Sequence, residues 1–349
     1  MKNRKHVMGI CAYTYSDPDY VLMKQAGIEW IRVGFTYPFK DRVHGELNPR
    51  FIETVEHVKT LRKKGFRIMG VTPLAGSFRF NKKLGKSVWH SELPEWAGTY
   101  DSDRYYEAYR EGCRETGKKT AGLVQLWQVS NEMDIRIFRG SMTIEQAARF
   151  LKEGSLGVKE GNPEAETSIN PAWLGADGRW LFENLYAKGE KTFDYAGIDG
   201  YFGSWAPGSP QSWPPLLEEI HQITKVPVVI HEWGYSSLGR VKKVPEGSPP
   251  EGWNSWNCYE KAWYNVWKKE HSEVEQAEFV KVVLEMFAGI PYLAGNFFFR
   301  WRDPSTCWQC GQSECPSECG WGLLNVQGKP KLAYYAFKEA HKTLFPVKK

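Results

Sequence analysis

The chain is predicted to be an α/β protein that folds as a single (β/α)₈ barrel, or TIM barrel, with long loops after its strands. Short apolar runs alternate eight times with segments in which apolar residues recur at helical spacing. The apolar runs are nearly continuous, as in strands of a parallel sheet that is covered on both faces. The length of 349 residues suits one barrel, and no linker divides it, so residues 1–349 are expected to form one catalytic domain.

Eight apolar runs are expected to form the strands. In chain order they are 6–11, 28–35, 66–74, 124–130, 166–171, 196–202, 226–231 and 292–299. Helical spacing is clearest at 50–64, where apolar residues stand at positions 51, 52, 55, 58 and 61 before Gly65 ends the pattern. The other expected helical segments are 20–25, one that starts at 101–103, one from 141 or 143 to 160, 180–191, 216–224, 272–288 and 332–344.

Alternating strands and helices imply a parallel sheet with right-handed crossovers, and eight such units imply closure into a barrel. Three long loops, at about 75–101, 233–271 and 302–320, follow strands at their carboxyl ends. Loops at that end of a barrel build the active site. The third loop is rich in cysteine.

The composition excludes several function classes. Hydrophobic residues make up 42% and charged residues 25%, as in an ordinary globular protein, and the net charge is only +5. The basic residues are scattered, so no nucleic-acid partner is expected. No apolar run is long enough to span a membrane, and the start of the chain lacks the pattern of a signal peptide. We therefore expect a cytoplasmic protein; the alternative is a secreted protein whose signal peptide has been removed. The oligomeric state is not addressed by the sequence.

Two glutamates stand at the ends of apolar runs that are expected to be strands four and seven. Glu132 follows the run 124–130, and Glu232 follows the run 226–231. A carboxyl group at the carboxyl end of a barrel strand points into the catalytic mouth. One such glutamate could simply pair with an arginine or cap a helix. Two that face one cleft suit the cleavage of a glycosidic bond, which needs a proton donor and a nucleophile or a stabilising charge.

At these residues the chain resembles glycoside hydrolase clan A, which comprises retaining (β/α)₈ β-glycosidases. The likeness rests on Asn131-Glu132 after strand four and on Glu232-Trp233-Gly234 after strand seven. It implies that Glu132 is the acid/base and that Glu232 is the nucleophile of a double displacement on β-linked oligo- or polysaccharides. It also implies carboxyl groups about 5–5.5 Å apart and an Asn131 side chain that binds the sugar 2-hydroxyl.

The same resemblance implies further residues in the site. Arg32 on strand two would keep the nucleophile ionised, and Tyr201 after strand six would lie near it, although a core tyrosine is the plain alternative. Trp301 after strand eight matches a tryptophan that floors the sugar subsite. Trp233 and Trp205 are candidate platforms for a sugar ring, because an aromatic face suits its C–H face. The histidine usual on strand three of the clan is absent, since 71–74 reads Val-Thr-Pro-Leu. This departure leaves the sugar, the linkage and exo or endo action open.

Two other functions are weighed against hydrolysis of glycosides. A carbohydrate-binding barrel would use the carboxylates only to hold its ligand. A barrel hydrolase of another class, such as a metal-dependent one, would need several histidines or aspartates at strand ends. The chain has only eight histidines, with no such set, so this function ranks last. No cofactor for catalysis is expected.

Four cysteines within the loop 302–320 form a candidate metal site. Cys307, Cys310, Cys315 and Cys319 are close enough in sequence to wrap four sulfurs around one tetrahedral Zn²⁺. In a reducing compartment a structural zinc ion is the favoured interpretation, and in a secreted protein two disulfides are favoured instead. Cys11, Cys113 and Cys258 are expected to be lone thiols.

Overall fold

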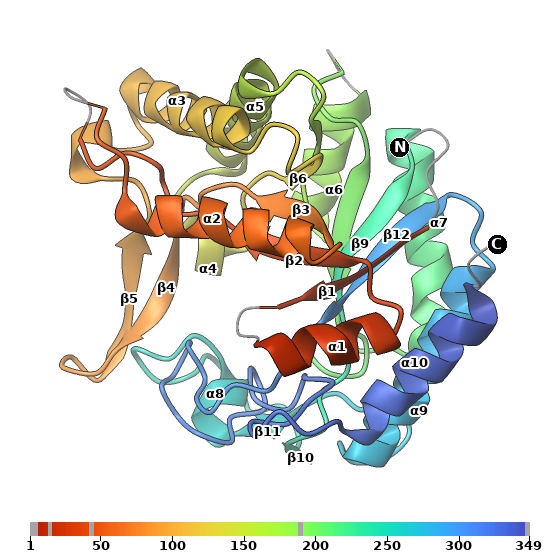
Figure 1. Cartoon of the computed structure of the whole chain (residues 1–349). Helices are drawn as coiled ribbons and strands as arrows, with labels where there is room; N and C mark the ends of the chain where they lie inside the picture. Colours follow the sequence, from red (N-terminus) through yellow and green to blue (C-terminus); the bar gives the residue numbers. More distant parts are fainter. Residues whose placement is uncertain (1–5, 13–15, 42–44, 188–190, 346–349) are drawn as a thin grey trace.

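Eight parallel strands form the central sheet of the chain, whose computed structural model describes residues 6–12, 16–41, 45–187 and 191–345. The strands follow the order β7-β6-β3-β2-β1-β12-β9-β8, and every neighbouring pair is parallel. The outer strands β7 and β8 are joined through backbone bonds, with Asp194 N donating to Thr167 O at 2.9 Å and Asp199 N to Pro171 O at 3.0 Å. The sheet is therefore a nearly closed barrel, with helices around its outside (Figure 1).

The strands of the barrel coincide with the eight apolar runs and are mostly shorter than those runs. Their bounds are β1 Val7–Cys11, β2 Trp30–Gly34, β3 Arg67–Val71, β6 Leu126–Gln128, β7 Glu166–Ser168, β8 Ala196–Gly200, β9 Val228–Trp233 and β12 Leu293–Phe299. The helices are α1 Asp17–Gln25, α2 Pro49–Lys63, α3 Asp103–Lys119, α4 Arg136–Arg139, α5 Ile144–Gly161, α6 Ala176–Phe182, α7 Trp213–Thr224, α8 Trp256–Glu260, α9 Glu273–Ala288 and α10 Leu332–Leu344. The predicted (β/α)₈ fold is confirmed.

Two predicted segments differ from the structure. The helix expected at 180–191 begins earlier, as α6, and continues as a π-helical turn over Glu183–Ala187; residues 188–190 lie outside the described residues. The loop expected at 75–101 contains an antiparallel hairpin, β4 Gly76–Asn81 and β5 Lys86–Ser91. Its short strands mix polar and charged residues with aromatic rings, so the segment lacks the continuous apolar run by which the other strands were predicted.

The core has one part inside the barrel and another between the barrel and its helices. The inner part contains Val7, Cys11, Trp30, Met69, Leu126, Tyr195, Val229 and Phe297. Outside, α3 and α5 pack closely because glycines on α5 leave room for the backbone of α3. A Cβ atom at Gly157 would lie 2.2 Å from the carbonyl oxygen of Arg110, so a larger residue there would force the helices apart.

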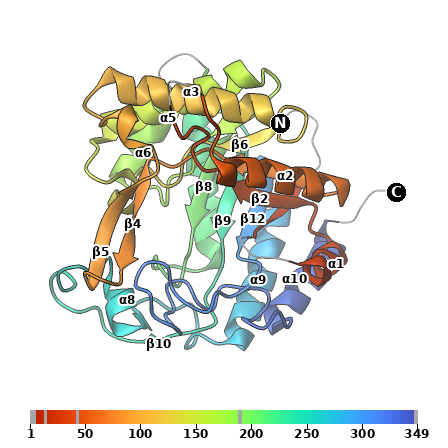
Figure 2. The same ribbon diagram turned by 60° about the vertical axis from the view of Figure 1, so that its left-hand side comes forward.

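Long segments after β3, β9 and β12 lie at the carboxyl ends of the strands. The β4–β5 hairpin lies beside the segment that carries α8 (Figure 2), and Ser87 N donates to Gly252 O at 2.7 Å. Ser87 Oγ also donates to Gln309 O, at 3.3 Å, in the cysteine-rich loop. The three loops expected to build the active site therefore contact one another.

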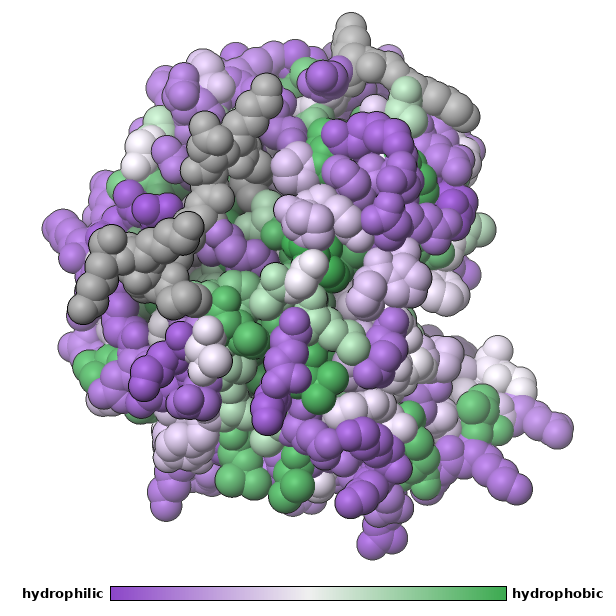
Figure 3. Space-filling view, turned by 90° about the vertical axis from the view of Figure 1, so that its right-hand side faces the viewer, coloured by the Kyte–Doolittle hydropathy of each residue, from purple (hydrophilic) through white to green (hydrophobic). Residues whose placement is uncertain are grey.

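The outer surface is ordinary for a globular protein. The face in Figure 3 is largely hydrophilic, with apolar side chains in small groups. No helix among the described residues is long and apolar enough to cross a membrane.

Candidate active site

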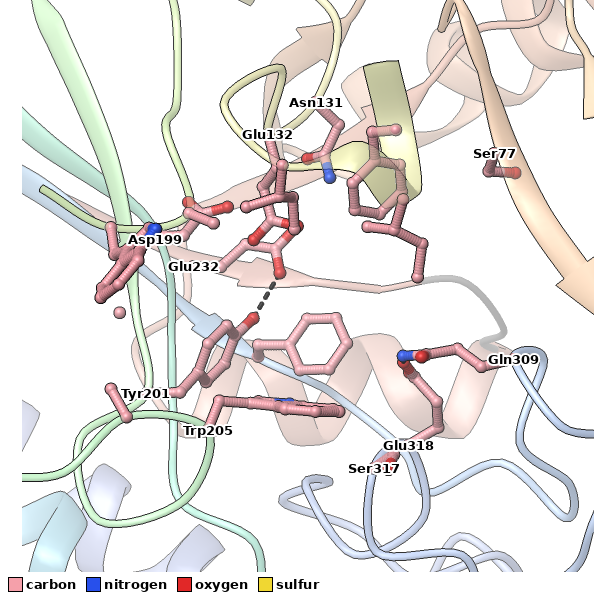
Figure 4. A pocket seen from close by; sticks show the side chains of 18 of the residues that line it. Ser77, Asn131, Glu132, Asp199, Tyr201, Trp205, Glu232, Gln309, Ser317 and Glu318 are labelled. Atoms are coloured by element: carbon pink, nitrogen blue, oxygen red, sulfur yellow. Dashed lines mark hydrogen bonds between the residues drawn. The ribbon is translucent and has the colours of Figure 1, made fainter. Parts of the chain in front are cut away.

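A cavity of about 1130 Å³ opens at the carboxyl ends of the barrel strands. Glu132 and Glu232 both line it, and Figure 4 shows the two side chains directed to the same part of the cavity. Strand-end loops from β2, β3, β6, β8, β9 and β12 contribute to its wall. The sequence prediction that the two glutamates share one cleft is thus supported by their placement.

Glu232 is a buried carboxylate at the end of β9 that is held by two partners. Arg32 Nη1 lies 2.7 Å from Glu232 Oε1, and both side chains are almost fully buried, at 5% and 9% exposure. The Tyr201 hydroxyl donates a hydrogen bond to Glu232 Oε2 (Figure 4). A guanidinium and a hydroxyl donor both stabilise the ionised form of a carboxyl group. Both carboxyl oxygens of Glu232 are therefore held by donors, which fix the orientation of the group.

Asn131 precedes Glu132 and is fixed through its side-chain oxygen. Asn131 Oδ1 accepts from Arg32 Nη2 at 2.8 Å, from Gln128 Nε2 at 2.9 Å and from Asn170 Nδ2 at 3.0 Å. Because amide nitrogens and guanidinium groups only donate, these bonds fix which end of the amide is the oxygen. The amide nitrogen of Asn131 is consequently turned to the cavity, as Figure 4 shows, where it can donate to a ligand.

The turn after β6 carries Glu132 in an unusual backbone conformation. Ser130 and Glu132 have positive φ angles of 57° and 40°. Non-glycine residues adopt this region rarely, and strain of this kind gathers at functional sites. The turn is held by Ser130 N, which donates to Thr72 Oγ1 at 2.8 Å, and by Glu132 N, which donates to Asn170 Oδ1 at 3.3 Å. The backbone thus directs the Glu132 side chain into the cavity.

Burial and neighbouring negative charges favour the protonated form of Glu132. Loss of solvent contact raises its pKa well above 4.5, and the charges of Glu232 and Asp134 raise it further. Asp199, at the end of β8, also has a pKa well above its usual range, because of burial and the charges of Glu232 and Glu132. Of the carboxyl groups at this end of the cavity, Glu232 alone has an arginine ion pair among the described contacts. The two glutamates therefore have contrasting surroundings: those of Glu132 favour its protonated form, and Glu232 is paired with a guanidinium group.

His231 lies in the barrel interior, below the cavity. The ladder between β8 and β9 shifts between Ile198 and Asp199, so His231 and Glu232 do not simply alternate. His231 Nδ1 lies 3.1 Å from Gln128 Oε1, and its Nε2 lies 3.2 Å from Ser168 Oγ. Burial lowers the pKa of His231 well below 6.5, so the neutral ring donates from Nδ1, because an amide oxygen only accepts. The bulge therefore turns the His231 ring into the barrel, where its hydrogen bonds link β9 to β6 and β7.

Of the three predicted tryptophans, Trp205 alone lines the cavity. Its ring lies near Tyr201 at one side of the cavity (Figure 4) and meets Trp263 edge to face at 5.2 Å. An aromatic surface beside the carboxyl groups can hold the C–H face of a sugar ring. Phe299, at the end of β12, also lines the cavity and packs edge to face on Tyr201 at 5.8 Å.

Two tryptophan predictions are wrong. Trp233 is fully buried on the outer side of β9, because alternation turns it away from Glu232; it packs on Phe287 of α9. Trp301 is fully buried below the loop after β12, where Nε1 donates to Asp19 Oδ1 at 3.0 Å and the ring packs on Tyr334. Neither belongs to the described residues that line the cavity.

Four residues that the sequence reasoning missed contribute to the site. Asp199 and Asn170 are joined by a 2.8 Å bond from Asn170 Nδ2 to Asp199 Oδ2. Asp199 lies near the end of β8 in the structure but inside the expected run 196–202, so a search for polar residues directly after apolar runs does not single it out. Across the cavity, Gln309 Nε2 donates to Glu318 Oε1 at 2.8 Å (Figure 4). Burial raises the pKa of Glu318 to about 7. Gln309 and Glu318 come from the cysteine-rich loop, where no periodic pattern shows which side chains face the cavity.

The predicted cysteine cluster is present with one change of member. The thiols of Cys307, Cys310 and Cys315 gather with that of Cys258, and all four sulfurs lie within 4.8 Å of one another. Cys319 is not in the group that could hold a metal ion, although it is buried nearby. Cys258, expected to be a lone thiol, is brought into the cluster by α8.

Solved structures of similar fold are known, although comparisons of the sequence alone find no match. No protein-family model matches the sequence, and no curated protein matches it. Among solved structures, GH5_18 from Streptomyces cattleya, in complexes with Manβ1-4GlcNAc and with GlcNAc, superposes with a TM-score of 0.68 at 15% identity, covering 99% of this chain and 82% of that chain. A family 39 glycoside hydrolase from Bacteroides cellulosilyticus gives 0.66 at 16% identity, covering 98% and 64%.

A third similar structure is Bacteroides uniformis β-glucuronidase, with a TM-score of 0.61 at 16% identity. The chain is covered to 96% but spans only 35% of that protein. The chain has the barrel fold of these glycoside hydrolases. The resemblance to clan A that the sequence suggested is supported at the level of the fold, and the roles of individual residues rest on the geometry of the site.

Proposed function

We propose that this protein is a retaining β-glycoside hydrolase with Glu132 as the general acid/base and Glu232 as the nucleophile. The observation that carries the proposal is the contrast between these two carboxyl groups in one cavity. The pKa of Glu132 is raised well above its usual range by burial and negative neighbours, whereas Glu232 is paired with Arg32 at 2.7 Å. A glycosidase needs a protonated and an ionised carboxyl group on the two sides of the scissile bond.

The surrounding residues give each step of the reaction a partner. Glu132 would protonate the leaving oxygen while Glu232 attacks the anomeric carbon and forms a glycosyl ester. Once Glu232 is esterified, its negative charge is gone and the pKa of Glu132 falls, because that charge helps to raise it. Glu132 then becomes a better base for the attacking water. The amide nitrogen of Asn131 would donate to the sugar 2-hydroxyl.

The size and lining of the cavity favour an oligosaccharide over a small metabolite. Its volume of about 1130 Å³ exceeds the roughly 300–1,000 Å³ common for drug-sized ligands. Its wall combines aromatic rings such as Trp205 with polar groups such as Gln309 and Glu318. This mixture suits a ligand with hydroxyl groups on its edges and C–H groups on its faces. The glycosidases with a similar fold support the same substrate class.

The proposal is tested with a panel of aryl β-glycosides and β-linked polysaccharides. Wild type should turn over at least one substrate, and Glu232→Gln should lose at least about a thousandfold in kcat. Glu53→Gln, an exposed residue on α2, is the matched control and should keep full activity. Saturable binding of a saccharide without turnover would favour the carbohydrate-binding barrel, and turnover that survives in Glu232→Gln would refute the assignment of the nucleophile.

A further inference from the structure

The four clustered thiols come from two loops that are far apart in sequence. Cys258 lies in the short helix α8, and Cys307, Cys310 and Cys315 lie in the loop after β12. All four side chains are buried. Two separations are given by close contacts: Cys258 Sγ lies 4.0 Å from Cys307 Sγ and 3.8 Å from Cys315 Sγ. The upper limit for any pair is 4.8 Å.

These separations match a tetrahedron of sulfurs around one metal ion. A Zn–S bond of about 2.3 Å places the sulfurs of a ZnS₄ centre about 3.8 Å apart along each edge. Disulfide bonding would need about 2.05 Å between sulfur atoms. The observed contacts of 3.8 and 4.0 Å are near the first value. Four thiolate ligands leave no open position, so such a centre is structural.

The local backbone also suits a metal site. Cys307 and Cys310 have the two-residue spacing common in zinc knuckles, and Gly311 follows with a φ of +70°. Gly311 N donates to Cys307 O at 2.7 Å, which closes this turn. The backbone N–H of Gln312 donates to the Cys310 sulfur, and Ser317 Oγ lies 3.3 Å from the Cys258 sulfur. A backbone N–H that donates to a ligand sulfur orients that ligand and favours its charge.

Cys319 differs from the other four in its surroundings. It belongs to a turn in which its backbone N–H donates to Cys315 O at 2.8 Å. Its sulfur is not in the group of four, which already supplies a complete tetrahedral ligand set. Cys319 is therefore the matched control for the ligands, since it is a buried cysteine of the same loop.

The candidate centre lies directly behind one wall of the cavity. Trp308 and Gln309 stand between two of the thiols in sequence, and Ser317 and Glu318 follow the third. All four side chains line the cavity. Ser255, which lines it as well, caps α8 by accepting from Cys258 N at 3.2 Å. An ion bound by these thiols would join the loop after β9 to the loop after β12.

We propose that Cys258, Cys307, Cys310 and Cys315 bind one structural Zn²⁺, which fixes the wall of the cavity that carries Gln309 and Glu318. The site holds its ion whether or not the barrel cleaves glycosides, so its test does not depend on the proposed function. The ion would add a covalent cross-link between two loops that have little regular secondary structure.

The first test is elemental analysis of the untagged full chain together with a count of its thiols. About one zinc per chain is expected for a four-thiolate site, with all seven cysteines reactive after denaturation in chelator without reductant. Three reactive thiols and no metal would mean two disulfides and would overturn the proposal. Seven thiols and no metal would mean that the cysteines only pack together, and iron in place of zinc would overturn the assignment of the ion.

The second test compares two variants. Cys310→Ser should lose the zinc, and hydrogen exchange in the segment 307–318 should rise, while Cys319→Ser keeps both the metal and the protection. Equal zinc in the two variants would refute the ligand set. If Cys310→Ser does not fold, removal of zinc from wild type with a mercurial reagent gives the same comparison. Hydrogen exchange that is unchanged after removal would refute the role of the ion in fixing the wall.

Discussion

Replacing Arg32 by methionine tests the arrangement that holds Glu232 as an anion. The two side chains are almost fully buried and their charged atoms lie 2.7 Å apart. At an effective dielectric constant of 20, charges at this distance attract by about 6 kcal/mol before desolvation is subtracted. Removing one partner of a buried pair costs about 3–5 kcal/mol, because the other charge is left uncompensated.

This loss should be visible in thermal unfolding followed by tryptophan fluorescence. For 349 residues the entropy of unfolding is about 0.7 kcal/mol/K, so 3–5 kcal/mol lowers the Tm by about 4–7 °C. Arg149→Met is the matched control. Arg149 pairs with Asp103 at 2.6 Å, but their side chains are 46% and 78% exposed, so its loss should cost under about 1 kcal/mol.

A double-mutant cycle separates the ion pair from the other contacts of Arg32. Glu232→Gln removes the same pair from the other side, so the cost of Arg32→Met should be smaller in the Glu232→Gln background. We expect the two substitutions to deviate from additivity by about 2 kcal/mol or more. Additivity to within about 0.5 kcal/mol would show that the two side chains are not coupled and would refute the reasoning.

Three further predictions follow from the same geometry. Glu132→Gln should lower kcat by about 10²–10⁴-fold on glycosides with poor leaving groups. The loss should be smaller on glycosides whose leaving group departs as a stable anion, and an equal loss on both would contradict the role of Glu132 as general acid. Burial raises the pKa of Asp134 from 3.8 to about 7, so its contribution to stability is full below pH 4 and is lost as the pH rises through 7. The free energy of unfolding in urea should therefore fall over this pH range by up to about 4 kcal/mol more in wild type than in Asp134→Asn, which keeps the acceptor for Ala172 N. Parallel curves of this free energy against pH would refute the prediction. Trp205→Ala should raise KM by about 3–10-fold, whereas Trp301→Phe should lower the Tm and leave KM unchanged; the opposite pattern would restore Trp301 to the sugar site.

The barrel and the position of its two strand-end glutamates could be predicted because both depend on strong local patterns. Eight continuous apolar runs mark the strands, and polar residues directly after such runs must lie at one edge of the sheet. Glu132 and Glu232 follow this rule, whereas Arg32 was predicted from the resemblance to clan A and from the need of a buried guanidinium for a carboxylate. Asp199 does not follow this rule, because it lies inside the apolar run 196–202.

The parts that the sequence did not predict depend on register and on long-range contacts. Trp233 was expected in the cavity because it follows Glu232, and Trp301 because it comes after β12. The side of the strand to which each ring turns depends on the local backbone at the end of the strand, which the sequence pattern does not show. Cys258 was missed because it is 49 residues from Cys307, and spacing indicates only clusters that are local in the chain. The hairpin β4–β5 was missed because its strands are half exposed.

The most direct test of the central claim is the site at which a mechanism-based inhibitor attaches. The protein would be treated with the 2-deoxy-2-fluoro-β-glycosyl fluoride of the sugar that the substrate panel identifies, and the modified peptide would be located by mass spectrometry. We expect a covalent glycosyl ester on Glu232 and none in Glu232→Gln. A label on Glu132 or Asp199, or inhibition without any covalent adduct, would contradict it.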